Sequence, residues 1–447
     1  MVENHEIELS SANKNKENNN SVKQPHYESH KKQLPISYLE TLANLFKANV
    51  GTGCFGMADA IKNAGIILGP IATIFIAIIC VECMRMLLNA ADYITEKNQL
   101  ITRPDYSHVV ELSFLISKHE RWRKYSKFMR MLCNVSLCLT QFGFCCVYFL
   151  FVSKSTKTIL DYYGFIFELE IVMLFVFIPI LLSALVRQLK YLAIFSAVAN
   201  VCMITGVSMT LYYCFIDLPP ITEHNFVRFD TLPLYFGTAL FAFEGITLVL
   251  PLHNVMKKPE NFSKFPFGVL HVGMSLVSFI YVLLGFMGYW KFGEQTEGSI
   301  TLNLPTNEIL AQVIIVMASF GVLFSYALQF FVGIHIILPP IFRNSKTAAK
   351  FPIYTEQIFR TLMVFVTFII AMLVPDLSLL LSLIGSVCCV ILAFVFPSIV
   401  ELMTRYDEGK IGTFYWIKNI IILTIALCGF ILGGGLALIN IYEEFIA

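Results

Sequence analysis

Long stretches of apolar residues recur along almost the whole chain. Five of them contain no Asp, Glu, Lys or Arg, namely residues 64–81, 131–153, 191–216, 377–400 and 419–442. Residues 265–290 and 309–342 carry no charge apart from their histidines, and residues 171–186 form a shorter run. A hydrocarbon layer of about 30 Å needs about 20 helical residues, because each residue rises about 1.5 Å. These eight runs therefore predict membrane-spanning helices.

Three weaker stretches raise the expected total to eleven: residues 38–62, 231–253 and 353–375. Gly51 and Gly53 interrupt the first, and Glu244 and Gly245 interrupt the second. The fold class predicted from this pattern is an all-α polytopic membrane protein with eleven transmembrane helices. Its membrane domain is expected to cover residues 36–442.

Lys and Arg are concentrated in alternate loops, which sets the expected orientation. The loop between the second and third spans is rich in them, whereas the opposite side has only Lys62, Lys154, Lys157, Arg228 and Lys291. We therefore expect the N-terminus in the cytoplasm and residues 443–447 as a short extracytoplasmic tail. Residues 1–35 are polar and lack apolar periodicity, so they are predicted to be a disordered cytoplasmic tail.

Composition agrees with a chain dissolved in lipid. Of its 447 residues, 57% are apolar and 14% are charged, against about 45–50% and about 25% in soluble domains. The net charge of +1 produces no electrostatic field that would attract a polyanion, so nucleic acid is excluded as a partner. The loops contain neither a GxxxxGK[ST] phosphate loop nor an HExxH metal motif. We therefore expect no cofactor, no metal and no enzymatic activity.

The helix breakers in the first and sixth spans point to a binding site. In hydrocarbon a broken helix is tolerated only where protein or a water-filled cavity covers its free backbone groups. Transporters built from inverted repeats place such breaks one five-helix repeat apart, as here. The N–H groups around Gly51 and Gly53 would hold a carboxylate, and carbonyls near Phe243 and Gly245 would hold an ammonium. The alternative is that these glycines only allow close helix packing.

The break residues and two aromatic residues on the third and eighth spans make up the predicted substrate site: Asn49, Gly51, Thr52, Gly53, Phe241, Phe243, Gly245, Tyr148 and Tyr326. Such a site suits a zwitterion, with aromatic side chains closing it. For the two tyrosines, packing or an interfacial belt is the alternative.

Glu244 is the candidate proton-coupling residue. A carboxylate at this depth is costly unless it is neutral or partnered, so a protonated Glu244 could carry the proton in symport. The alternatives are a structural Glu bonded to free N–H groups of the break, or a pair with Lys47, which could instead reach the interface. Asp59 and Lys62 are expected at the outer interface. His271 and His335 are either proton-handling groups or hydrogen-bonded interior residues.

Four blocks of sequence resemble the proton-coupled amino acid transporters, a branch of the amino acid/auxin permeases. They are LFKANVGTGCFGMADAIKNAGIILGP (45–70), LFAFEGITLVLPLHNVMKKPENF (240–262), GYWKFGEQTEGSITLNLP (288–305) and SYALQFFV (325–332). The resemblance implies a leucine-transporter-like fold of two inverted five-helix repeats plus one extra helix. It also implies symport of protons with small neutral amino acids such as glycine, alanine and proline.

Two departures from the family pattern bear on function. Family members often carry a histidine before the glycine motif that is thought to take part in proton coupling, and Asn44 stands at that position. Because Asn cannot titrate, coupling would pass through Glu244, or the chain would be a proton-independent facilitator. The twelve cysteines all lie in or next to predicted spans, so the extracellular disulfide of some relatives is not expected.

The sequence therefore predicts a secondary active transporter that works by alternating access. It would sit in the plasma membrane or an endolysosomal membrane. An amino acid sensor with little flux, which would need a cytoplasmic signalling partner, is the alternative.

Overall fold

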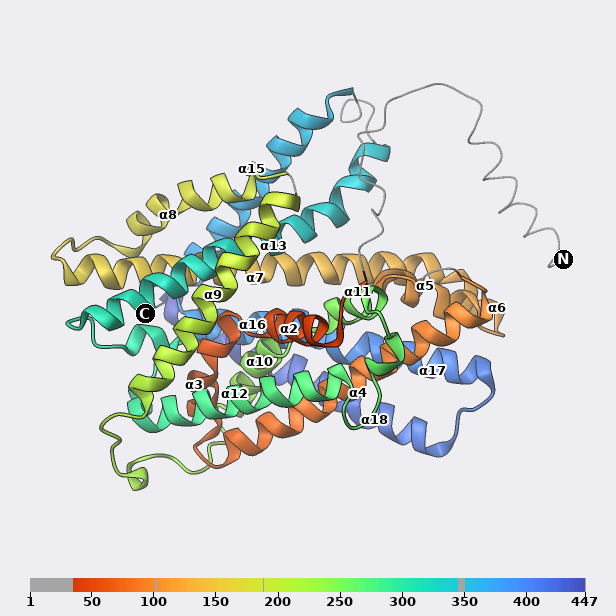
Figure 1. Cartoon of the computed structure of the whole chain (residues 1–447), viewed down its shortest axis with the longest axis horizontal. Coiled ribbons are helices and arrows are strands. Elements are labelled where there is room, and N and C mark those ends of the chain that lie inside the picture. The colour runs from red at the N-terminus through yellow and green to blue at the C-terminus, as the bar shows by residue number, and fades with distance from the viewer. Residues whose placement is uncertain (1–34, 101–102, 188, 345–349, 447) are drawn as a thin grey trace. The chain divides into compact units, whose positions relative to one another are not determined.

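A computed structural model describes residues 35–100, 103–187, 189–344 and 350–446. The predicted N-terminal tail lies outside these residues, except for Pro35. Within the described ranges every regular element is helical, in agreement with the predicted fold class (Figure 1). The helices are α2 (Tyr38–Asn49), α3 (Thr52–Ala64), α4 (Leu68–Lys97), α5 (Tyr106–Leu115), α6 (Glu120–Lys124), α7 (Ser126–Tyr162), α8 (Leu169–Ala184), α9 (Leu189–Cys214), α10 (Leu232–Ala242), α11 (Ile246–Val255), α12 (Val269–Phe292), α13 (Ile309–Asn344), α15 (Pro352–Leu373), α16 (Leu377–Ile384), α17 (Phe396–Glu408), α18 (Thr413–Cys428) and α19 (Gly434–Ile446).

Nine helical stretches of the described chain are long and apolar enough to cross a membrane. Two of them contain π-helical turns, which connect α16 to α17 and α18 to α19. The shorter α8 and the interrupted pair α2 and α3 are the candidates for the two further spans, and the total of eleven stays a prediction. The last helix runs through Ile446, so it includes most of the residues expected to form an extracytoplasmic tail.

The two breaks predicted from the sequence are present. α2 ends at Asn49 and α3 begins at Thr52, while α10 ends at Ala242 and α11 begins at Ile246. The start of the first span also meets the end of the sixth. Ile36 pairs with Met256 in a short parallel bridge, and the N–H of Ile36 donates to the carbonyl of Val255 at 2.9 Å. Both broken spans are thus held beside each other at the break and at one end.

Almost every residue of α3 is buried, and so is most of α10. α10 packs against α3 and α16, and α12 packs against α2, α3 and α4. These contacts put both breaks in the interior of the bundle. Two short helices, α5 and α6, lie in the basic segment between the second and third spans, where the sequence predicted only a loop.

Candidate functional site

The two breaks lie in direct contact. A Cβ atom added to Gly53 would lie 2.6 Å from the Cα of Ala242, and one added to Gly245 would lie 2.6 Å from Oδ1 of Asn49. Real Cβ atoms do not approach other atoms this closely. At Gly53 the clash is with the backbone of Ala242, so glycine is required there, whereas at Gly245 it is with the side chain of Asn49, which would have to move. Their backbone angles alone do not require glycine, since φ at Gly245 is −116°.

Backbone groups at the breaks form two sets of opposite polarity. Thr52 and Gly53 open α3, and the first N–H groups of a helix have no carbonyl one turn earlier to bond. The carbonyls of Asn49 and Ala242 close α2 and α10. Donors for an anion and acceptors for a cation therefore lie a few residues apart, where the helix dipoles reinforce both charges.

Tyr281 of α12 joins the two breaks and was not predicted from the sequence. Its hydroxyl contacts the carbonyl oxygen of Asn49, and it lies 2.7 Å from the carbonyl oxygen of Ala242. A hydroxyl has one hydrogen, so the two carbonyls share one donor. The side chain is fully buried. The need of a buried tyrosine hydroxyl for a partner is the one signal that could have singled it out.

Asn49 and Thr52 present polar side-chain atoms at the break. Nδ2 of Asn49 donates to the carbonyl of Leu45 at 2.9 Å, which fixes the amide so that Oδ1 faces Gly245. Oδ1 of Asn49 is buried without a hydrogen-bond partner in the described residues, and the side chain of Thr52 interacts with the hydroxyl of Tyr148. Buried polar atoms are normally bonded, so Oδ1 of Asn49 marks a place where a polar ligand fits.

Aromatic side chains of α7 cover the breaks. The hydroxyl of Tyr148 lies 3.9 Å from the Cβ position of Gly51. Tyr148 stacks on Phe144 with ring centroids 6.3 Å apart, and Phe144 meets Phe241 edge to face at 4.7 Å. Phe243 packs edge to face on Tyr281 at 4.9 Å. The structure thus gathers Tyr148, Phe241 and Phe243 around the predicted site.

Tyr326 is placed differently. Its hydroxyl is 2.9 Å from Oγ1 of Thr367 on α15, and its ring stacks on Phe330 with centroids 5.7 Å apart. Its described contacts are thus with α13 and α15, and none joins it to either break.

Glu244 lies in the break between α10 and α11 and is 8% exposed. Neither carboxylate oxygen has a hydrogen-bond partner among the described residues, so neither Lys47 nor a free backbone N–H reaches it there. Its surroundings include Cys80, Cys389 and Tyr106. Asn44 is exposed on α2.

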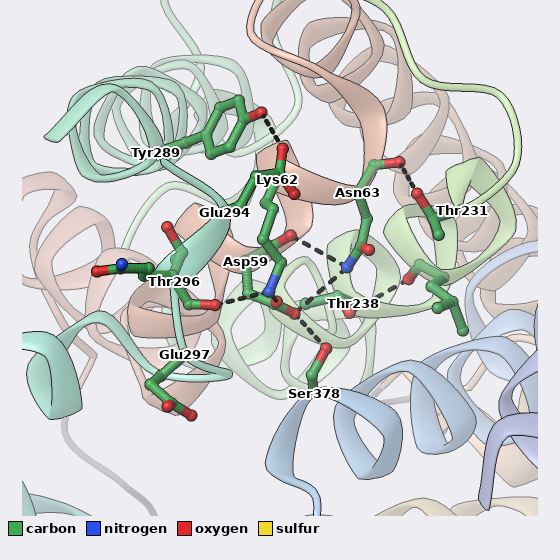
Figure 2. Close-up of polar contacts among 12 residues, drawn as sticks. Asp59, Lys62, Asn63, Thr231, Thr238, Tyr289, Glu294, Thr296, Glu297 and Ser378 are labelled. Atoms are coloured by element: carbon green, nitrogen blue, oxygen red, sulfur yellow. Dashed lines mark hydrogen bonds and ion pairs between the residues drawn. The ribbon is translucent and has the colours of Figure 1, made fainter. Parts of the chain in front are cut away.

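A second buried ionic cluster lies further along α3 (Figure 2). Asp59 pairs with Lys62 at 2.7 Å and accepts a hydrogen bond from Ser378 at the start of α16. Nζ of Lys62 also donates to the carbonyl of Thr296 at 2.6 Å. The side chain of Asp59 is fully buried against other parts of the protein, while its place at the outer interface of the membrane stays a prediction. It holds three elements together: α3, α16 and the loop after α12.

The remaining candidates lie away from the breaks. Nδ1 of His335 is 2.9 Å from the carbonyl of Phe331, one turn earlier in α13, and His271 lies beside Phe265 at the start of α12. All twelve cysteines are free thiols. The described residues contain no group of three or more His, Cys, Asp or Glu side chains placed to hold a metal ion.

Paired helix breaks at the centre of a polytopic bundle define the chain as a multi-pass membrane transporter. It belongs to the family described as transmembrane amino acid transporter protein, which matches residues 35–440. This confirms the resemblance seen in its sequence.

Relatives agree with this assignment. The chain is 38% identical over 399 residues to the proton-coupled amino acid transporter-like protein pathetic of Drosophila melanogaster, covering 88% of this chain and 82% of that protein. It is 25% identical over 390 residues to the probable amino acid transporter skat-1 of Caenorhabditis elegans, covering 84% and 82%. Both are named as transporters, which agrees with transport rather than catalysis.

A solved structure shares the fold. It is that of Mhp1, a nucleobase-cation-symport-1 family transporter, in a closed conformation with bromovinylhydantoin bound. The TM-score is 0.50 at 13% identity, covering 93% of this chain and 96% of that one. The likeness supports the leucine-transporter-like architecture, while the division into two five-helix repeats stays a prediction.

Proposed function

We propose that the chain is a secondary active transporter of small neutral amino acids that works by alternating access around the two helix breaks. One observation carries this proposal: the opening N–H groups of α3 and the last carbonyls of α2 and α10 meet at Gly53 and Gly245. That arrangement offers an anion site and a cation site side by side, which matches the two charges of an α-amino acid.

The substrate side chain is expected to be small. Phe241 and Phe243 crowd the α10 side of the break, and Tyr148 with Phe144 covers the α7 side. Glycine, alanine and proline are therefore the expected substrates, and a polyamine is disfavoured because the break carries a single carboxylate, Glu244. Of the predicted site residues, Asn49, Gly51, Thr52, Gly53, Phe241, Phe243, Gly245 and Tyr148 are proposed to line the site.

Glu244 is proposed to carry the coupled proton. An ionised carboxylate without a partner is costly in the membrane interior, so the neutral acid is the favoured form while both oxygens stay buried. Opening to water would let the proton leave. The name of the Drosophila relative, a proton-coupled transporter-like protein, supports coupling of this kind. The proposed orientation puts the N-terminus and the basic loops in the cytoplasm.

Uptake into proteoliposomes tests this function. Labelled glycine, alanine and proline would be offered with and without an inward proton gradient. We expect uptake that the gradient accelerates and that a protonophore slows to its gradient-free rate. Uptake indifferent to the gradient would indicate a facilitator or another coupling ion, and binding without uptake would favour a sensor.

A further inference from the structure

A cavity of about 1050 Å³ opens between α4, α12, α17 and α18. None of the residues of the two breaks lines it. Its wall on α4 consists of residues three or four positions apart, which lie on one helix face: Ile74, Ala77, Ile78, Val81, Glu82, Arg85 and Asn89. α4 packs against both α12 and α17, and α17 packs against α18, so α4 forms the floor of this groove. Figure 1 shows α4, α12 and α18 close together in one part of the bundle.

The groove has an apolar half and a charged half. Ile74, Ile78 and Phe279 line the apolar half, and each is at least 50% exposed. Because these residues belong to membrane-spanning helices, their exposed faces meet lipid. The other half is lined by Glu82 and Arg85 from α4, Glu401 and Arg405 from α17, and Lys418 from α18. A surface that met only acyl chains would not carry these charges.

Side chains of opposite charge form a connected series of ion pairs that ends at the guanidinium group of Arg85. Lys418 pairs with Glu401 and with Glu82 at 2.9 Å each, and Glu82 pairs with Arg85 at 3.0 Å. The ammonium group of Lys418 is therefore already paired with two carboxylates. Arg85 meets Glu82 through one of the five N–H groups of a guanidinium, and 42% of its side chain is exposed. Its remaining donors face the open groove and suit a phosphate oxygen pair.

The length of the groove matches one leaflet of a bilayer. Ile74 and Arg85 are separated by eleven residues of continuous α-helix, so about 16 Å of rise separates the apolar end from the guanidinium. Half of a hydrocarbon core of about 30 Å is about 15 Å. A headgroup at Arg85 would therefore leave its acyl chain alongside Ile78 and Ile74, ending near the bilayer centre.

We infer that this groove binds one glycerophospholipid. Its phosphate lies against Arg85, next to Lys418, and one acyl chain lies along Ile74, Ile78 and Phe279. Free phosphate would leave the apolar half unused, and a sterol would leave the guanidinium donors that Glu82 does not use without an acceptor. With the basic loops in the cytoplasm, the lipid belongs to the cytoplasmic leaflet.

Native mass spectrometry of the purified full chain tests this inference. The protein would be washed free of loose lipid and titrated with phosphatidylethanolamine, with diacylglycerol of the same acyl chains, and with cholesterol. We expect one phosphatidylethanolamine to bind at least tenfold more tightly than diacylglycerol or cholesterol. Equal binding of diacylglycerol, or tighter binding of cholesterol, would overturn the inference.

Two variants and a matched control locate the site. Arg85→Gln removes the guanidinium, and Ile78→Trp fills the apolar half from an already exposed position; each should weaken phospholipid binding at least tenfold. Arg130→Gln is the control, since Arg130 is similarly exposed and pairs with Glu111 at 2.9 Å, but does not line the groove. The inference fails if Arg85→Gln and Ile78→Trp retain the lipid as Arg130→Gln does. Both variants lie outside the breaks, so this result is independent of the transport assay.

Discussion

Replacing Tyr281 with Phe removes the one hydroxyl that joins the two helix breaks. The ring would stay in place against Phe243, because Phe has the same shape. The carbonyl oxygens of Asn49 and Ala242 would lose their shared donor. The half-helices would then be free to shift, and the carbonyls would no longer be held in position for a substrate ammonium.

The expected size of the effect follows from the single hydrogen of the hydroxyl. Leaving one buried acceptor unsatisfied costs about 1–3 kcal/mol, and the two carbonyls share one hydrogen bond, so the cost is not doubled. At about 1.4 kcal/mol per factor of ten, a loss of this size in the bound state weakens alanine binding by roughly 5- to 150-fold.

Equilibrium binding of labelled alanine to purified protein measures this loss. Tyr289→Phe is the matched control, because Tyr289 is a fully buried tyrosine on the same helix whose hydroxyl bonds Glu294 at 3.0 Å, away from the breaks. We expect Tyr281→Phe to weaken binding and Tyr289→Phe to leave it unchanged. Wild-type affinity in Tyr281→Phe, or an equal loss in both variants, would refute the positioning role of this hydroxyl.

Two further predictions concern the buried carboxylates. Glu244→Gln keeps the shape of the side chain but cannot titrate, so alanine uptake should lose its acceleration by a proton gradient while gradient-free uptake remains. Glu120→Gln on the exposed α6 is the control and should behave as wild type. Acceleration that persists in Glu244→Gln would exclude the coupling role. Asp59→Asn leaves the ammonium of Lys62 without its carboxylate. Breaking a buried pair typically costs about 3–5 kcal/mol of stability, and because Lys62 is 20% exposed we expect a loss of up to about 3 kcal/mol. Thermal unfolding in detergent would measure this loss, with Asp161→Asn as the control, because the exposed pair of Asp161 with Lys157 should contribute at most about 1 kcal/mol. Equal losses of stability in the two variants would contradict the structural role of the Asp59 cluster.

Nine of the eleven predicted spans and both breaks could be predicted because their signals are local. A run of about 20 apolar residues has few alternatives to a membrane helix, and a glycine or a carboxylate within such a run marks a break. The short helices α5 and α6 were missed because they have only 10 and 5 residues, too few to give a run of about 20 apolar residues. Their stability comes from packing beside α7 rather than from composition.

The role of Tyr281 and the burial of Asp59 depend on contacts between distant parts of the chain. Tyr281 and Asn49 are 232 residues apart in sequence, and Ser378 and Asp59 are 319 residues apart. A tyrosine in an apolar span and an acid near the end of one have the same local pattern whether they face lipid, water or another helix. Only the arrangement of α12 and α16 around α3 decides between these environments.

The central claim is that the substrate sits where the two breaks meet, and alanine binding to Gly245→Ala tests it most directly. The added methyl group would lie 2.6 Å from Oδ1 of Asn49, so that side chain must turn away, while the backbone can stay in place. Gly435→Ala in α19 is the control, because its Cβ position has no heavy atom within 4 Å. We expect alanine affinity to fall at least tenfold in Gly245→Ala, with stability lowered by no more than about 1.5 kcal/mol through loss of the Asn49–Leu45 hydrogen bond, and to stay at the wild-type value in Gly435→Ala. Undiminished binding to a folded Gly245→Ala variant would contradict the account.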